Sequence, residues 1–131
     1  MSRRERGRAS GLRSWLLPVL TAAALLTGCG AGPPADEDPE VARGRALYLR
    51  SCTLCHGPGG EGKPGLGRPL KDNDFIAIRS QRELVEFLKV GRRASDPANR
   101  SGVLMPPRGG NPRLSEADLA AISAYLQSLQ E

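Results

Sequence analysis

The sequence predicts an all-α domain of three main helices joined by long loops. Three segments, 39–50, 80–90 and 115–129, carry apolar residues at helical spacing, and no stretch alternates as a strand would. Two connections, 57–71 and 94–113, are dense in Gly and Pro, and loops of that length are uncommon in so small a domain. Aromatic residues make up only 4% of the chain, which leaves a thin core. We therefore expect the loops to wrap a group that is not protein.

The first predicted helix runs from Pro39 to about Arg50. Asp38 is a favourable N-cap, and Pro39 suits the first turn, where no N–H is needed. One face of this helix carries its apolar residues together with a glycine: Val41, Gly44, Leu47 and Tyr48.

The other two predicted helices also have recognisable ends. Ser80 and Glu83 form a capping box that begins the second helix, and Gly91 ends it. The third helix begins at Ser115 and has acidic residues in its first turn, where the helix dipole favours negative charge. Apolar residues form one side of each helix: Leu84, Val85, Phe87 and Leu88 in the second, and Leu119, Ile122, Leu126 and Leu129, with Tyr125 nearby, in the third.

The positive charge of the chain is concentrated at its N-terminus. The sequence has 19 Lys and Arg against 14 Asp and Glu, a net charge of +5, and residues 1–13 hold five of the Arg residues. The apolar stretch 15–26 follows, and a basic segment before a short apolar one is typical of a secretory signal. It is shorter than the roughly 20 residues that a membrane-spanning helix needs. Without residues 1–28, 14 basic residues face 13 acidic ones, so the composition does not indicate a nucleic-acid-binding protein.

The apolar stretch ends in Leu26-Thr27-Gly28-Cys29, which resembles the bacterial lipobox. In that motif the Cys is acylated and becomes the first residue of the mature protein. The alternative is a soluble exported protein in which Cys29 has no role. The lipobox interpretation divides the chain into a lipoprotein signal peptide (1–28), a lipidated Cys with a flexible linker (29–38) and a folded domain (39–131).

The motif that carries chemistry is Cys52-Thr53-Leu54-Cys55-His56. The two thiols of Cys-x-x-Cys-His can add to the vinyl groups of haem, and the His that follows can bind the iron. A zinc site would need further ligands, and the chain offers no second His, because His56 is its only one. A redox dithiol favours a βαβ context, which this sequence lacks. A structural disulfide has no use for the adjacent His. The motif therefore predicts one haem c, attached through Cys52 and Cys55, with His56 as an iron ligand.

With this motif, the sequence resembles the class I monohaem c-type cytochromes over residues 39–131. Gly44 and Tyr48 lie eight and four residues before Cys52, where this family has a Gly and an aromatic residue. The resemblance implies the cytochrome c fold, in which these two residues let the N-terminal helix cross closely over the C-terminal helix. The matching positions on the C-terminal helix are Ile122 and Tyr125.

Met105 is the only Met beyond the initiator, and it lies in the Gly- and Pro-rich loop just before the third helix. The family places a thioether iron ligand in this region, so the resemblance implies that His56 and Met105 are the two axial ligands. A thioether is a soft ligand that favours ferrous iron. With both axial positions filled, the iron has no open position for peroxide or oxygen, which implies an electron carrier and not an enzyme.

Other site residues also come from the resemblance. Arg68-Pro69-Leu70 resembles the family's Pro-Leu, in which the Pro carbonyl accepts a hydrogen bond from the imidazole of the His ligand. The resemblance thus implies that Pro69 orients His56, and Pro64 is the competing assignment. The family often has a Trp beside a haem propionate, and residues 29–131 have none. Three arginines remain as candidates for that role or as ordinary surface residues: Arg92, Arg93 and Arg100.

The predicted function is that of an exported, lipid-anchored monohaem cytochrome c on the periplasmic or other extracytoplasmic face of a bacterial membrane. Its partners would be redox proteins such as a membrane oxidase or a quinol-oxidising complex, with no nucleic acid and no small-molecule substrate. One alternative is a haem c subunit of a larger oxidoreductase. The other is a ligand-binding or peroxidatic haem protein, which requires Met105 to leave the iron.

Overall fold

The computed structural model describes residues 37–130, which contain two isolated β-bridges and no strand. The elements, in chain order, are α1 (Pro39–Ser51), α2 (Thr53–His56), α3 (Asp74–Ala77), α4 (Gln81–Val90), the 3-10 helix η1 (Pro107–Gly110) and α5 (Glu116–Ser128). Helices α1, α4 and α5 confirm the three main helices expected from the sequence. The other elements are not foreseen from the sequence, because a segment of four residues is too short to show a hydrophobic period.

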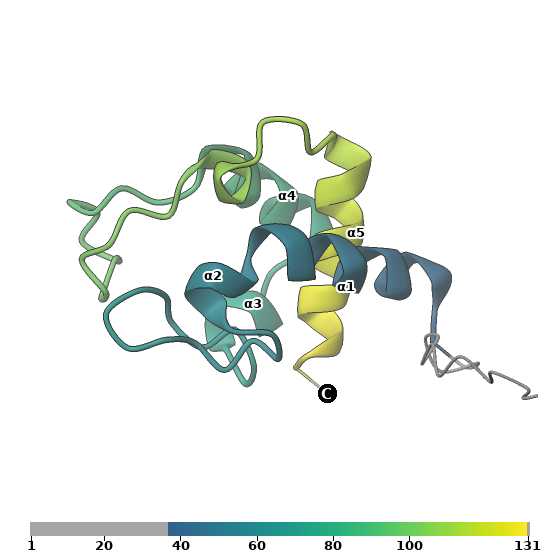
Figure 1. Cartoon of the computed structure of the whole chain (residues 1–131), viewed down its shortest axis with the longest axis horizontal. Coiled ribbons are helices and arrows are strands. Elements are labelled where there is room, and N and C mark those ends of the chain that lie inside the picture. The colour runs from purple at the N-terminus through teal and green to yellow at the C-terminus, as the bar shows by residue number, and fades with distance from the viewer. Residues whose placement is uncertain (1–36, 131) are drawn as a thin grey trace, which may run out of the picture. The chain divides into compact units, whose positions relative to one another are not determined.

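Helix α1 crosses α5 at very short range, and Gly44 makes this approach possible (Figure 1). A Cβ placed on Gly44 would overlap the carbonyl oxygen of Ala121 and lie 3.0 Å from Cβ of Tyr125. One turn further along α1, the buried ring of Tyr48 packs 5.2 Å from the ring of Tyr125. The crossing therefore falls on Ala121 and Tyr125, where the sequence predicts Ile122 and Tyr125. Successive helix residues point about 100° apart, so Ile122 instead faces the interior of the domain.

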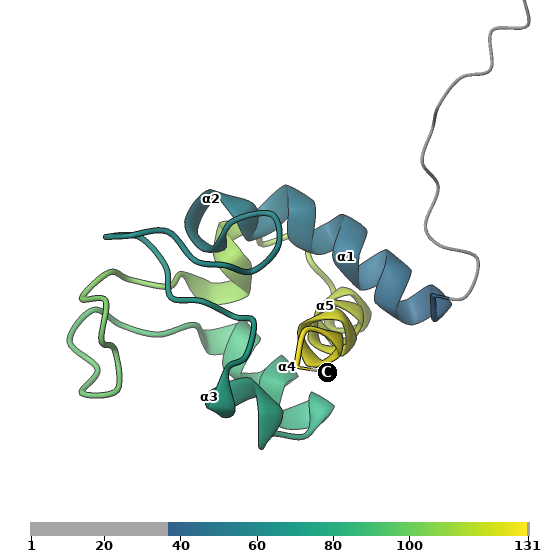
Figure 2. The same ribbon diagram turned by 90° about the horizontal axis from the view of Figure 1, so that it is seen from below.

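Helix α4 also packs against α5 and completes the helical core. Figure 2, in which α5 is seen nearly end-on, shows α1 and α4 on different sides of it. Both helices contribute buried leucines to the core: Leu84 and Leu88 from α4, and Leu119 and Leu126 from α5. The two long loops extend together away from this helical core (Figures 1 and 2).

The helix N-termini use the capping chemistry expected from the sequence. Asp38 accepts hydrogen bonds from the backbone N–H groups two and three residues on, and Ser80 with Glu83 forms the predicted capping box. A further capping box, Ser115 with Asp118, begins α5. The hydrogen bonds from Ser115 lower the pKa of the Asp118 carboxyl. These caps fix where α1, α4 and α5 begin and thereby set the directions of the helices that form the core.

Within residues 37–130, each helix is too short or too polar to cross a membrane. The predicted signal peptide, Cys29 and all but the last two residues of the predicted linker lie outside the described residues, and they stay predictions.

Candidate haem-binding site

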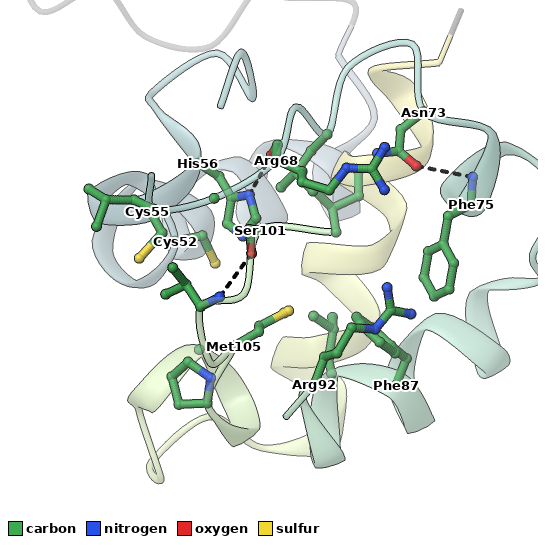
Figure 3. Close-up of a pocket in the computed structure, with 18 of the residues that line it drawn as sticks. Cys52, Cys55, His56, Arg68, Asn73, Phe75, Phe87, Arg92, Ser101 and Met105 are labelled. Atoms are coloured by element: carbon green, nitrogen blue, oxygen red, sulfur yellow. Dashed lines mark hydrogen bonds between the residues drawn. The ribbon is translucent and has the colours of Figure 1, made fainter. Parts of the chain in front are cut away.

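The helices and the two loops enclose a mainly apolar cavity of about 250 Å³ (Figure 3). Apolar side chains from four helices line it: Tyr48, Ile76, Leu84, Leu88, Ile122 and Leu126. The cavity therefore lies between the helices and the loops, in the region where the sequence predicts that the loops wrap a non-protein group.

The Cys-x-x-Cys-His motif forms one wall of this cavity. Cys52 lies between α1 and α2, Cys55 and His56 lie on α2, and both thiols are free. Burial and, to a smaller extent, the neighbouring Cys55 raise the pKa of the Cys52 thiol to about 11. Thiols that exchange disulfides or attack substrates have lowered pKa values, so this environment does not favour a redox dithiol. In the part of the chain that the structure describes, no three His, Cys, Asp or Glu side chains gather to hold a metal ion.

His56 has a fixed orientation and a fixed tautomer. Its Nδ1 lies 2.7 Å from the carbonyl oxygen of Arg68, and since a carbonyl can only accept, Nδ1 carries the proton and donates. In the neutral ring, Nε2 then keeps its lone pair and is free to bind a metal. The resemblance implies the carbonyl of Pro69 as this acceptor, with Pro64 as the alternative, and the observed acceptor lies one residue before Pro69. The carbonyl of Pro69 instead accepts a hydrogen bond of 2.6 Å from Nδ2 of Asn73.

Gly67 explains why the Arg68 carbonyl can reach Nδ1 of His56. A Cβ at Gly67 would lie 2.6 Å from the carbonyl oxygen of Cys55 and 3.0 Å from Nδ1 of His56. Only a glycine lets the loop pass this close to the ring. Two backbone hydrogen bonds with Lys63, of 2.9 and 3.1 Å, hold Gly67 in a short turn. Gly67 is a site residue that no motif in the sequence marks, and its only signal there is its position directly before Arg68-Pro69-Leu70.

Met105 lies on the cavity wall, away from the motif. Figure 3 shows its side chain reaching into the cavity, with His56 on the other side. Its backbone is fixed by hydrogen bonds in both directions with Arg92, of 2.8 and 2.9 Å, at the end of α4. Two prolines and η1 follow it. The structure thus brings the thioether of Met105, the two thiols and the imidazole of His56 to one cavity.

The guanidinium of Arg92 also lines the cavity, and its surroundings are unusual for a charged group. Its central carbon lies 4.8 Å from the ring centre of Phe75 and 4.9 Å from that of Phe87. Its Nη1 donates to the Ala98 carbonyl at 3.3 Å, and its Nε, which is buried without a hydrogen-bond partner, forms an ion pair with the Asp96 carboxylate at 3.6 Å. An ion pair of this length leaves the N–H without a close acceptor, so a carboxylate within hydrogen-bond distance would satisfy it better. Of the other candidate arginines, Arg100 is exposed at the cavity and Arg93 is exposed outside it.

These groups together fit a haem c. The apolar walls suit a porphyrin, the two free thiols suit its vinyl groups, and Nε2 of His56 and the thioether of Met105 suit iron. The Nε of Arg92, which makes no hydrogen bond, suits a haem carboxylate. An all-α fold with a Cys-x-x-Cys-His motif at such a cavity defines a class I c-type cytochrome.

The chain belongs to the cytochrome c family, because the family model described as Cytochrome c matches residues 41–130. Members of this family are electron carriers and not catalytic enzymes. Membership implies a covalently bound haem c, with which Cys52 and Cys55 in their Cys-x-x-Cys-His motif are consistent.

Several known proteins are similar to the chain. Cytochrome c4 of Thiocapsa roseopersicina is 32% identical over 110 residues, which cover 75% of this chain and 52% of that protein. Cytochrome c-555 of Chlorobaculum thiosulfatiphilum is 30% identical over 87 residues, which cover 66% of this chain and 93% of that protein. The cbb3-type cytochrome c oxidase subunit CcoP of Rhodobacter capsulatus is 31% identical over 105 residues, which cover 76% of this chain and 32% of that protein.

Among solved structures, the c-type cytochrome XoxG of Methylobacterium extorquens AM1 superimposes with a TM-score of 0.54 and 25% identity. The match covers 70% of this chain and 51% of XoxG. The chain thus spans about half the length of cytochrome c4 and XoxG, and about a third of the oxidase subunit.

Proposed function

We propose that this chain is an exported, membrane-tethered cytochrome c that holds one haem and carries single electrons between redox proteins. The observation that carries the proposal is the convergence of His56, Met105 and the two thiols of the motif on one apolar cavity. When bound there, the haem would supply one-electron chemistry, since its iron can be ferric or ferrous.

Each side chain has a separate role in this proposal. Cys52 and Cys55 would hold the porphyrin covalently, so the carrier would not lose its cofactor between partners. His56 would bind iron through Nε2, and the hydrogen bond from its Nδ1 to the Arg68 carbonyl would orient the ring and increase its basicity. Met105 would supply a neutral, soft sulfur, which favours the ferrous state and raises the reduction potential relative to a second His.

Arg92 is our proposed partner for a haem carboxylate, in preference to Arg93 and Arg100. Its guanidinium is held over two aromatic rings, and within the described residues its Nε is buried with an ion pair to Asp96 at 3.6 Å but no hydrogen bond. The attraction between a guanidinium and a carboxylate is stronger inside an apolar cavity than in water, because the local dielectric is low, although both charges must first lose their hydration. The arginine would thereby offset the cost of placing a carboxylate beside the core.

A redox titration of the purified full-length protein, followed by its visible spectrum, tests the proposal. One haem with two protein ligands should give a single reversible step of one electron, and the mass of the intact protein should include one haem in addition to the mature polypeptide and the acyl groups on Cys29. Two steps, or a protein mass without haem, would contradict the proposal.

For the membrane tether, the support is the lipobox at Leu26–Cys29 and the short linker that follows it. The linker of residues 30–38 spans at most about 30 Å when fully extended, so the domain would stay close to the bilayer surface. Replacing Cys29 with Ser should release the protein from the membrane fraction into the soluble periplasmic fraction. A Cys29→Ser variant that still sediments with membranes would contradict lipid anchoring.

A second candidate is a haem c subunit of a larger oxidoreductase, with the same residues serving electron relay inside the complex. What favours it is the 31% identity to CcoP, which by its name is a subunit of an oxidase. Purification in mild detergent separates the two proposals. A carrier elutes alone or with substoichiometric partners, whereas a subunit co-elutes with its complex at a fixed ratio.

A further inference from the structure

The segment that carries Met105 is joined to the end of α4 by an unusually close backbone contact. Arg92 and Met105 form an isolated antiparallel bridge, in which Arg92 N–H donates to the Met105 carbonyl (2.8 Å) and Met105 N–H donates to the Arg92 carbonyl (2.9 Å). Gly91 lies against the same segment, at Met105 and Pro106. A Cβ at Gly91 would overlap the Met105 carbonyl oxygen and lie 2.8 Å from the carbonyl carbon of Pro106. The chain can therefore approach this closely only because residue 91 has no side chain.

This contact is anchored to the rigid part of the molecule. Gly91 has φ 71° and ψ −154°, a conformation open essentially to glycine alone, and its N–H donates to the Phe87 carbonyl at 2.8 Å, which ends α4. Helix α4 is in turn fixed to the core by buried Leu84 and Leu88. The position of the Met105 backbone is thus set by a helix and not by the loop that contains it.

A second contact joins the two ends of the loop that runs from Arg92 to Met105. The side-chain amide of Asn99 donates to the carbonyl of Arg93 at 2.9 Å and to that of Val103 at 2.8 Å, and so ties the outgoing and returning segments together. The segment that returns to the cavity is therefore held at two positions: at Val103 by the Asn99 side chain, and at Met105 by its backbone hydrogen bonds with Arg92.

We propose that Gly91 and the backbone of Arg92 are positioning residues that hold the thioether of Met105 at the cavity. The inference rests on the proposed function, in which Met105 is an iron ligand. A thioether is uncharged and a weaker donor than imidazole, so it stays bound only if little chain entropy is lost on ligation. Because residues 91 and 92 already fix the backbone of Met105, little further chain entropy is lost when its sulfur binds the iron. Gly91 is therefore needed for the iron–sulfur bond and not only for ending α4.

Gly91→Ala, compared with Gly102→Ala, tests this proposal. Both glycines have positive φ (71° and 67°) and flank the same loop, but a Cβ at Gly102 would meet nothing within 4 Å. The readouts are the sulfur-to-iron charge-transfer band of the ferric holo-protein and the rate of carbon monoxide binding to the ferrous form. Carbon monoxide binds only the molecules in which sulfur is off the iron, so both its apparent affinity and its rate of binding rise with that fraction. Urea denaturation of both variants gives the accompanying change in overall stability.

The expected result is loss of the band in Gly91→Ala, with carbon monoxide binding faster by about tenfold or more, while Gly102→Ala matches the wild type. Equal bands in the two variants would overturn the inference, as would loss of the band in proportion to overall stability in both. A wild-type protein that itself lacks the band would instead refute Met105 as a ligand, so the failure of the proposed function is a different observation.

Hydrogen exchange on the wild type keeps the proposal testable if Gly91→Ala yields no holo-protein. Imidazole added to the ferric protein displaces the sulfur. If residues 91 and 92 hold Met105, the amide protons of Arg92 and Met105 remain protected after displacement. If both amides lose protection on displacement, the iron holds the segment and the inference is wrong.

Discussion

Replacing Gly44 with Ala tests the close crossing of α1 over α5. On an isolated helix this change would be stabilising by about 1 kcal/mol. In this fold the added methyl group would lie 2.5 Å from the carbonyl carbon of Ala121 and 3.0 Å from Cβ of Tyr125, where ordinary carbon contacts are about 3.5–4.0 Å. Helix α1 must then move away by roughly 1 Å, and the lost packing outweighs the gain in helix propensity. We expect Gly44→Ala to lower the free energy of unfolding by about 2 kcal/mol or more.

Urea denaturation of the holo-protein, followed by circular dichroism, measures this change. A loss of about 2 kcal/mol lowers the midpoint by roughly 1 M at the slope typical of a small domain. Ala46→Gly is the matched control, because Ala46 is exposed on the same helix and its replacement should cost only the propensity difference of about 1 kcal/mol. A Gly44→Ala midpoint equal to or above that of the wild type would refute the reasoning, since it would mean that a Cβ has room at this crossing.

Three further predictions concern stability. Tyr48→Phe removes the buried hydrogen bond of 2.6 Å to the Gly57 carbonyl and should lower the free energy of unfolding by about 1–2 kcal/mol, whereas an unchanged urea midpoint would mean that the bond contributes nothing. Burial raises the pKa of both Tyr48 and Tyr125, so above about pH 10 the folded chain keeps protons that the unfolded chain releases. Stability should therefore be full below that pH and fall as the pH rises beyond it, and Tyr48→Phe should flatten this fall; a parallel fall in the variant would contradict the assignment. Ser115→Ala removes the N-cap of α5 and should lower the free energy of unfolding by about 1 kcal/mol in the same urea assay. An unchanged midpoint would mean that water satisfies the end of the helix as well as Ser115 does.

The main helices could be predicted from the sequence because each is long enough to show a period and has a chemically distinct start. Ser80 with Glu83 is an example, since a capping box satisfies backbone donors by local contacts alone. The Cys-x-x-Cys-His motif is likewise local, because the spacing of its thiols and imidazole on one turn of helix is set by the chain itself. Features that depend only on near neighbours in the sequence are therefore predictable.

The remaining features depend on contacts between distant segments, which a hydrophobic period does not encode. The acceptor for His56 is the Arg68 carbonyl and not that of Pro69, because Gly67 lets the loop approach the ring one residue earlier. Gly91 is recognisable in the sequence as the end of a helix, but its contact with Met105 exists only in the folded chain.

The absorption spectrum of the ferric holo-protein is the most direct test that His56 and Met105 hold the iron, because it reports whether sulfur is bound. We predict a sulfur-to-iron charge-transfer band in the wild type and its loss in Met105→Ala, which should also bind carbon monoxide rapidly when reduced. A wild-type spectrum without the band, or a Met105→Ala variant that retains it, would contradict His56 and Met105 as the pair that holds the iron.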